Sequence, residues 1–319
     1  MNNSADFPTD FDRLLRNLER VIRGKNSVLR LALTCFFAEG HLLIEDVPGT
    51  GKTSIARALA ASIRGQFRRI QFTPDLLPTD VTGATILNAQ RTGFDFHPGG
   101  VFANIVLADE INRASPKTQA ALLEVMEERR VTADSKSYKV PRPFIVIATQ
   151  NPVELDGTYP LPEAQLDRFL LRIEVGYPDA RSEREILSGY REGAAIDSLP
   201  QVLTVERVHE MVGQAAAVTV ASEVQDYIIG LAAATRNLPD VRLGVSPRGS
   251  IALMRAARVR ALADGRGFVL PEDIKGLATA AFAHRMIIHP EAELRGVLSA
   301  DSIHQVLAAV PVPRVTSRD

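Results

Sequence analysis

The sequence predicts an α/β domain built on a parallel sheet, followed by a smaller, all-helical domain. As far as Tyr177, short β-rich apolar runs alternate with helical stretches, which is typical of a parallel sheet covered by helices. Beyond Pro178, helical patterns follow one another, separated by proline and glycine. The length of 319 residues also favours two domains, at about 150 residues each. We therefore expect an α/β domain over residues 1–177 and a helical domain over residues 178–319.

The elements of the first domain follow from hydrophobic spacing. Helical spacing extends from Leu14 to Ala38, with Gly24 as an interruption. Short apolar runs that end in turn residues indicate buried strands, whereas stretches of good helix formers indicate helices. Strands are accordingly expected over 41–45, 69–72, 104–108 and 144–149, and further helices over 53–63 and 116–128.

The second domain contains little strand-like sequence. Its apolar residues recur at helical spacing, and proline or glycine separates one stretch from the next. Helices are expected over 181–188, 205–218, 222–237, 247–264, 271–283 and 301–310.

The composition excludes several classes of protein. Lysine and arginine number 37 against 38 aspartates and glutamates, which lacks the basic excess of a nucleic-acid coat protein. One cysteine, Cys35, allows no internal disulfide and fits a reducing compartment. The N-terminus has no signal-peptide pattern, and the apolar run 31–38 is far too short to span a bilayer. A cytoplasmic protein without a transmembrane segment is expected.

Residues 46–53 read DVPGTGKT, which matches the phosphate-loop pattern G-x-x-x-x-G-K-[ST] except for Asp46 in place of the first glycine. Glycines let backbone N–H groups approach phosphate oxygens, and the following helix presents its positive end. Lys52 is expected to reach the β- and γ-phosphates, and Thr53 to bind Mg²⁺. The alternative is a strand–turn–helix with a chance Gly-Lys-Thr. The expected nucleotide-binding residues of this Walker A loop are Val47, Pro48, Gly49, Thr50, Gly51, Lys52, Thr53 and Ser54.

An apolar strand ends in Asp109-Glu110, as in a Walker B motif. The carboxyl ends of parallel strands face the ligand crevice of such a sheet. Asp109 is expected to hold Mg²⁺ through its water shell, and Glu110 to orient and deprotonate the attacking water. The alternative is an acidic helix cap after a strand.

Five segments together resemble the AAA+ ATPases, and within them the MoxR family. They are HLLIEDVPGTGKT (41–53), DEINRASPKTQAALLEVMEERRVT (109–132), ATQNP (148–152), LPEAQLDRF (161–169) and GVSPRGS (244–250). The resemblance implies a P-loop AAA+ core with a five-stranded parallel sheet and an all-α lid. It also implies Mg²⁺-dependent ATP hydrolysis by a homo-oligomer, with a hexameric ring expected. The work implied is chaperone-like remodelling or maturation of a protein client, with a von Willebrand factor A domain protein as partner and no nucleic acid.

The resemblance also assigns roles to single residues. Asn151 is similar to the sensor-1 residue that fixes the attacking water, although an Asn-Pro turn is the alternative. Arg168 is similar to the arginine finger, which acts on ATP of the neighbouring subunit; an ordinary surface arginine is the alternative, and Arg113 and Arg172 are rivals for interface roles. Arg248 is similar to sensor 2, which contacts the γ-phosphate and couples it to the lid. The segment with Ile22 and Gly24 resembles the adenine pocket.

Two segments resemble hairpins inserted in this branch of AAA+ proteins. They span 87–101 and 130–143, and would face a central pore or a partner. Candidates for contact are Phe94, Phe96, Lys136 and Tyr138. Two solvated hairpins without a contact role are the alternative.

Two other functions compete with the MoxR assignment. A nucleic-acid motor would have related hairpins, but the charge balance argues against it. The motor subunit of a metal chelatase would have a similar architecture, but the segment beginning at Asp109 favours MoxR.

Overall fold

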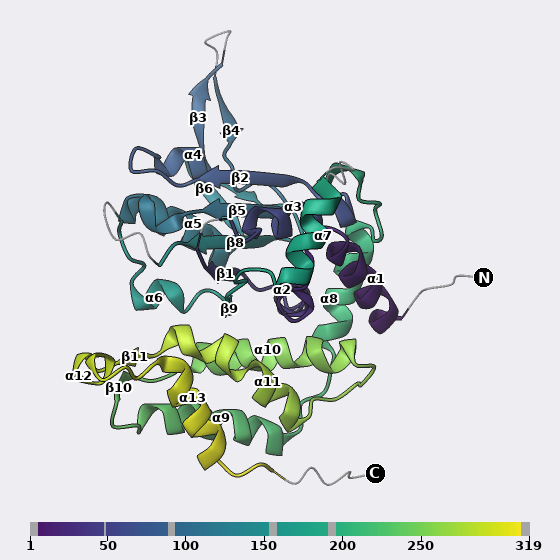
Figure 1. Cartoon of the computed structure of the whole chain (residues 1–319). Helices are drawn as coiled ribbons and strands as arrows, with labels where there is room; N and C mark the ends of the chain where they lie inside the picture. The colour runs from purple at the N-terminus through teal and green to yellow at the C-terminus, as the bar shows by residue number, and fades with distance from the viewer. Residues whose placement is uncertain (1–5, 48, 89–92, 153–157, 191–195, 314–319) are drawn as a thin grey trace.

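The computed structural model describes residues 6–47, 49–88, 93–152, 158–190 and 196–313. Figure 1 shows a sheet with flanking helices in its upper half and a layer of helices beneath. Among the described residues, no helix is both long and apolar enough to cross a membrane. The fold therefore has the two parts that the sequence predicts.

The main sheet has five parallel strands in the order β2-β5-β8-β1-β9. The strands are β1 (Leu42–Glu45), β2 (Phe67–Gln71), β5 (Ile105–Asp109), β8 (Ile145–Gln150) and β9 (Leu171–Ile173). Four of them match the expected strands within two residues. The fifth, β9, has no signature in the sequence, because three residues are too few to show a period.

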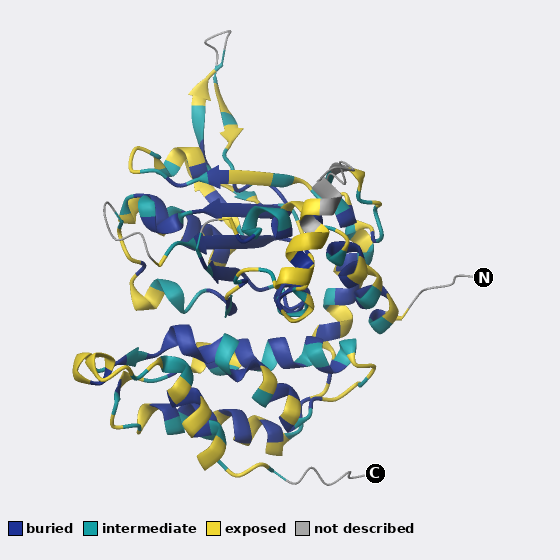
Figure 2. Ribbon diagram, viewed as in Figure 1, coloured by how far each residue is buried: buried dark blue, intermediate teal, exposed yellow. Residues whose placement is uncertain are grey.

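Successive residues of the central strands face two different cores. In β5, Ile105 and Leu107 pack into the core on one face, and Val106 and Ala108 into the core on the other. This alternation of faces explains why the strands read as continuous apolar runs. Figure 2 shows the central strands buried over almost their whole length.

Helices cover both faces of the sheet. The first core contains residues of α1 (Phe7–Glu19), α2 (Asn26–Phe37) and α3 (Lys52–Ile63), and the second contains residues of α5 (Pro116–Glu128). Residues 20–25 separate α1 from α2, and they include Gly24, which the sequence predicts as an interruption. Shorter helices of this part are α4 (Pro78–Thr82), α6 (Glu163–Leu166) and, beside the sheet in Figure 1, α7 (Ala180–Tyr190).

Both expected hairpins are present. One consists of β3 (Gly83–Leu87) and β4 (Phe94–Pro98), and the other of β6 (Arg130–Ala133) and β7 (Lys136–Lys139). Phe96 stacks on Tyr138 with ring centroids 4.0 Å apart, so the two hairpins contact each other. Two of the four candidate contact residues therefore pair with one another, while Phe94 and Lys136 remain exposed.

The helical layer contains five of the six helices expected for the second domain, and the sixth, expected over 181–188, corresponds to α7 beside the sheet. Helix α10 (Pro247–Ala263) of the layer packs against α1 and α2 of the sheet domain. A two-stranded antiparallel ladder, β10 (Val241–Leu243) with β11 (Ile287–Ile288), also lies there and was not expected. The helices of the layer are α8 (Val205–Ala216), α9 (Ser222–Arg236), α10 (Pro247–Ala263), α11 (Pro271–Phe282), α12 (Pro290–Leu294) and α13 (Ser299–Ala309). The domain division at residues 177 and 178 stays a prediction.

Candidate functional site

A cavity of about 360 Å³ lies at the carboxyl ends of β1, β5 and β8, beside the start of α3. It combines the glycine loop with the acidic strand end. Its lining residues are Gly49, Gly51, Lys52, Thr53, Ser54, Asp109, Glu110, Thr149, Gln150 and Asn151. Eight of these were expected from the sequence as nucleotide, metal or catalytic residues.

The loop between β1 and α3 has the backbone that a phosphate cradle needs. Gly49 and Gly51 have φ angles of +87° and +91°, which L-residues with side chains rarely adopt. Apart from the glycine itself and its two neighbours in the chain, no atom lies within 4 Å of the place where a Cβ would be at either position. A side chain there would project into open space of the kind that phosphate oxygens need. Pro48 lies outside the described residues.

Lys52 folds back onto this loop. Its Nζ donates to the carbonyl oxygens of Asp46 at 2.6 Å and Val47 at 3.0 Å. Burial lowers the pKa of Lys52 below its ordinary value, although the negative charges of Asp46, Asp109 and Glu110 oppose that shift. The ammonium group therefore contacts the loop and lines the cavity, where it could bind an anionic ligand.

The contacts of Asp46 explain why this residue replaces the first glycine of the loop pattern. Its carboxylate is buried and accepts hydrogen bonds from the backbone N–H groups of Val47 at 2.7 Å, Val175 at 2.9 Å and Gly176 at 2.6 Å. The last two residues follow β9. Asp46 therefore ties the start of the loop to the edge of the sheet.

One hydroxyl joins the two acidic residues at the end of β5. Thr149 Oγ1 donates to Asp109 Oδ1 at 2.6 Å and accepts from the Glu110 N–H at 2.8 Å. The other oxygen of Asp109 accepts from Arg69 Nη2 at 2.7 Å. Asp109 thus presents a fixed carboxylate at the cavity wall.

Glu110 is held at a sharp turn of the chain. Its φ is +55°, which is uncommon for a residue with a side chain. Its Oε2 accepts from Gln71 Nε2 at 2.9 Å and from Arg113 Nη1 at 3.0 Å. Arg113, a rival for an interface role, therefore pairs with Glu110 within this chain.

Four expected residues near the loop and the adenine segment lie away from the cavity lining. Val47 and Thr50 belong to the loop, and the Thr50 hydroxyl donates to Val47 O at 3.3 Å. Ile22 is buried in the core, and a Cβ on Gly24 would collide with Ser182 at the start of α7. The structure therefore does not bring the expected adenine segment into this cavity.

The expected arginines Arg168 and Arg248 also lie away from it, and they meet at a second cavity, of about 210 Å³, between the sheet domain and α10. Arg168 Nε lies 3.0 Å from Glu127 Oε2, and Arg248 bonds the other oxygen of the same carboxylate. The two arginines come from sites 80 residues apart (248 − 168) and converge on one anionic group. Arg172, the other rival, instead pairs with Glu45 at 2.9 Å.

Sequence reasoning missed several residues of these sites. Thr149 lies in the ATQNP segment but carries no signal of its bridging role. Arg69 and Gln71 come from β2, and Glu127 from the exposed side of α5. Their roles depend on neighbours across the sheet or across the domain boundary, which no local pattern shows.

The residues of the first cavity are of the kinds that hold phosphate groups together with Mg²⁺. The open space at Gly49 and Gly51 and the nearby Lys52 suit phosphate oxygens. Among the described residues no group of three or more His, Cys, Asp or Glu side chains could hold a metal alone. Mg²⁺ commonly takes one or two carboxylates together with substrate phosphates and water, and Asp109 with Thr53 offers that set.

The fold and this cavity define the class of protein, an AAA+ P-loop protein with a lid. The family described as "ATPase family associated with various cellular activities (AAA)" matches residues 41–171. The AAA lid domain matches residues 233–306.

Similar proteins narrow the class to one family. YeaC of Bacillus subtilis is 48% identical over 94% of each chain. Chaperone MoxR1 of Mycobacterium tuberculosis is 40% identical over 96% of this chain and 83% of its own. A crystal structure of a candidate ATPase from Cytophaga hutchinsonii has a TM-score of 0.90 at 37% identity, and covers 97% of this chain and 96% of that one. The chain belongs to the MoxR family of AAA+ ATPases.

Proposed function

We propose that this protein hydrolyses ATP to ADP and phosphate with Mg²⁺, and uses the energy to remodel or mature a protein client. The observation that carries the proposal is the single cavity that brings together Lys52, Thr53, Asp109, Glu110 and Asn151. These side chains come from three separate segments of the chain. They supply a cation for phosphates, hard oxygen ligands, a carboxylate base and a polar group for water.

The eight residues of the cavity that the sequence predicted have roles in this proposal. Backbone N–H groups of the glycine loop and Ser54 surround the phosphates, and Lys52 contacts the terminal two. Thr53 and Asp109 would hold Mg²⁺, which neutralises charge on the phosphate oxygens. Glu110 takes the proton of the attacking water, which Asn151 helps to orient. Ile22 and Gly24, which lie outside the lining of this cavity, are proposed to lie against adenine.

Arg168 is proposed, as the resemblance implies, to act on the nucleotide of a neighbouring subunit. Arg248 is the expected sensor 2, and because it lies beside Arg168 at Glu127, we extend the proposal to Arg248 as well. Both lie outside the lining of the cavity in their own chain and present a pair of guanidinium groups at a second one. Positive charge at the γ-phosphate stabilises the transition state of phosphoryl transfer. This arrangement needs a homo-oligomer, and we propose a hexameric ring.

The proposed partners are a protein client and a von Willebrand factor A domain protein, in the cytoplasm. A relative bears the name chaperone, which supports a protein client. The exposed Phe94 on the β3–β4 hairpin supplies an apolar contact site. A nucleic-acid motor is the second candidate function, and the one observation that favours it is the presence of the two hairpins. ATPase rates that rise with single-stranded DNA at a stated salt concentration would favour it.

The test of the reaction compares two variants of the cavity. Lys52→Ala should lose nucleotide binding, because the phosphates lose their cation. Glu110→Gln should bind ATP with normal affinity but turn over at least about a hundredfold more slowly, because the base is lost. Binding of a fluorescent ATP analogue and release of phosphate measure the two effects. Normal turnover by Glu110→Gln would contradict the assignment of the base.

The test of the client uses the same Glu110→Gln variant as a trap. A subunit that binds ATP without hydrolysing it should retain a client, so the client is expected to co-purify from the native cell in the presence of ATP. Lys52→Ala is the matched control. Equal amounts of every co-purified protein with both variants would contradict ATP-dependent client binding.

A further inference from the structure

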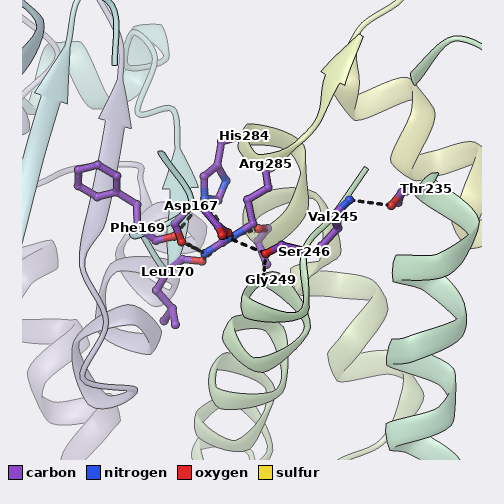
Figure 3. A network of polar contacts seen from close by, with 10 residues as sticks. Asp167, Phe169, Leu170, Thr235, Val245, Ser246, Gly249, His284 and Arg285 are labelled. Atoms are coloured by element: carbon purple, nitrogen blue, oxygen red, sulfur yellow. Dashed lines mark hydrogen bonds and ion pairs between the residues drawn. The ribbon is translucent and has the colours of Figure 1, made fainter. Parts of the chain in front are cut away.

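A network of polar contacts crosses the boundary between the sheet domain and the helical layer at Arg285. This residue lies just after α11, and its side chain is only 2% exposed. Figure 3 shows it reaching toward the segment 167–170, which leads into β9. A buried guanidinium group is costly unless its donors are satisfied, and here four of its six hydrogen bonds cross the boundary.

Arg285 binds the backbone as well as the carboxylate of this segment. Its Nε donates to Asp167 Oδ1 at 2.7 Å, and its terminal nitrogens donate to the carbonyl oxygens of Asp167 at 3.1 Å and Leu170 at 3.2 Å. It also bonds the carbonyl of Phe169. Four contacts therefore fix the chain on both sides of Arg168, whose backbone has little freedom to move relative to α11.

The second oxygen of Asp167 holds the start of α10. Ser246 Oγ donates to Asp167 Oδ2 at 2.9 Å, and Ser246 is the N-cap of α10. Arg248 is the second residue of that helix. The first turn also packs on Arg285, because a Cβ on Gly249 would lie 2.9 Å from Arg285 Cδ. The same carboxylate that stands next to Arg168 thus sets the position of Arg248.

This network brings the guanidinium groups of Arg168 and Arg248 close together. Arg168 and Arg248 each pair with one oxygen of Glu127, so their guanidinium groups are held within the span of a single carboxylate. That spacing is suited to a single phosphate group, which also offers adjacent oxygens to paired donors.

We propose that Asp167 and Arg285 are positioning residues that hold Arg168 and Arg248 as one pair for the terminal phosphate of a nucleotide in the neighbouring subunit. The inference rests on the proposed trans action of those arginines. We further infer that the segment 167–170, which carries Arg168, moves together with the helical layer, because Arg285 of that layer binds it.

The experiment measures how well a subunit donates its arginines. Lys52→Ala subunits lack nucleotide binding but keep both arginines, whereas Arg168→Ala subunits keep the nucleotide cavity but lack the finger. Mixed in one oligomer, the two should restore ATPase activity that neither has alone. Replacing the donor by Lys52→Ala/Asp167→Asn should lower the restored kcat by about tenfold or more. The KM for ATP should stay within about twofold, because the active cavities belong to the other subunit.

The matched control breaks a comparable ion pair elsewhere in the helical layer. Arg266 bonds Asp273, whose side chain is also only 2% exposed, at 2.7 Å. A Lys52→Ala/Arg266→Ala donor should restore activity as well as Lys52→Ala does. The Asp167→Asn change keeps the side-chain volume and one acceptor oxygen. Arg285→Lys serves as a second donor variant if thermal unfolding shows that Asp167→Asn does not fold.

The outcomes separate the two proposals. If Lys52→Ala and Arg168→Ala subunits restore no activity at any ratio, the trans action fails, and the inference fails with it. If they restore activity and the Asp167→Asn donor is equally effective, the positioning role alone is overturned. Equal losses with the Arg266→Ala donor would also overturn it, because any disturbance of the helical layer would then suffice.

Discussion

At the scale of single residues, the site depends on side chains that hold the reacting groups in place. Thr149 is the clearest case, because its hydroxyl both donates to Asp109 and accepts from the Glu110 backbone. The positive φ of Glu110 makes that backbone contact valuable, since a strained turn needs support from its surroundings. One hydroxyl therefore fixes both the proposed metal ligand, Asp109, and the proposed base, Glu110.

Removing this hydroxyl should impair both stability and turnover. Thr149→Val keeps the shape but leaves the Glu110 N–H without its acceptor, so we expect the free energy of unfolding to fall by about 1–3 kcal/mol. We expect kcat to fall by about tenfold or more. A rise of only about 1.4 kcal/mol in the activation free energy, which slightly misplaced groups would cause, lowers the rate tenfold. Denaturant unfolding and phosphate release measure these effects.

Thr149→Ser is the control, since it retains the hydroxyl. A Thr149→Val enzyme as stable and as fast as Thr149→Ser would show that the bridge contributes nothing.

At the scale of elements, the phosphate loop is held to the sheet edge by Asp46. Strand β9 has three residues and pairs only with β1 among the described strands. The Asp46 carboxylate adds hydrogen bonds from Val175 and Gly176, directly beyond that strand. The short strand and the loop therefore stabilise each other.

Restoring the usual glycine at this position should harm the protein. Asp46→Gly recreates the G-x-x-x-x-G-K-[ST] pattern but removes three hydrogen bonds to a charged group. We expect the free energy of unfolding to fall by about 2–4 kcal/mol and ATP binding to weaken, because buried N–H groups lose their acceptor. Denaturant unfolding with and without ATP measures both.

Asp46→Asn keeps one acceptor oxygen. Its free energy of unfolding and its affinity for ATP should therefore lie between those of the parent protein and of Asp46→Gly. If Asp46→Gly bound ATP more tightly and unfolded no more easily, Asp46 would be a tolerated departure without a structural role.

The hairpins give a second prediction at this scale. Phe96 stacks on Tyr138 and also contacts Phe102, whereas Phe94 is 71% exposed. Phe96→Ala should lower the free energy of unfolding by about 1–3 kcal/mol and loosen both hairpins in hydrogen exchange. Phe94→Ala should stay within about 0.5 kcal/mol of the parent protein, as exposed substitutions usually do. Equal effects of the two changes would contradict the packing of one hairpin on the other.

At the scale of the whole molecule, two buried histidines link stability to pH. His41 accepts from the Val146 N–H at Nδ1 and lies 3.0 Å from Met126 O at Nε2, which requires a neutral ring. Burial lowers the pKa of His41 to about 3. Burial and the charge of Arg285 lower the pKa of His284 well below its usual range. One histidine joins the sheet to α5, and the other lies at the boundary with the helical layer.

Stability should therefore fall as the solution becomes acidic. Above about pH 6.5 both histidines are neutral in the folded and unfolded states, so neither makes stability depend on pH. Below it the unfolded chain binds protons that the folded chain excludes, and for His41 this continues to about pH 3. Each histidine then shifts the folding equilibrium toward unfolding by up to about tenfold per pH unit.

Denaturant unfolding between about pH 7.5 and pH 5 would measure this slope. His41→Gln should remove one of the two contributions and give a shallower decline, even if its stability at neutral pH is lower. A parent protein whose stability declines no more steeply than that of His41→Gln would contradict the role of His41.

Much of the fold and of the first cavity could be predicted from the sequence. The strands that end at Glu45 and Asp109 lie within one or two residues of their expected places, and Gly49, Lys52 and Glu110 line one cavity. These signals are local, because turn glycines and apolar runs act through the chain nearest to them. The three-residue β9 and the ladder of β10 with β11 were missed, since both exist only by pairing with distant partners.

By itself, the sequence determined the class of domain, the phosphate loop and the acidic pair, because each is encoded by residues close together in the chain. Only the tertiary structure decided that Arg168 and Arg248 meet at Glu127 and that Asp167 and Arg285 lie against them. Asp167 and Arg285 are 118 residues apart, and nothing local to either one selects the other. Their contact depends on how the helical layer packs against the end of the sheet, where burial makes a charged group require a partner.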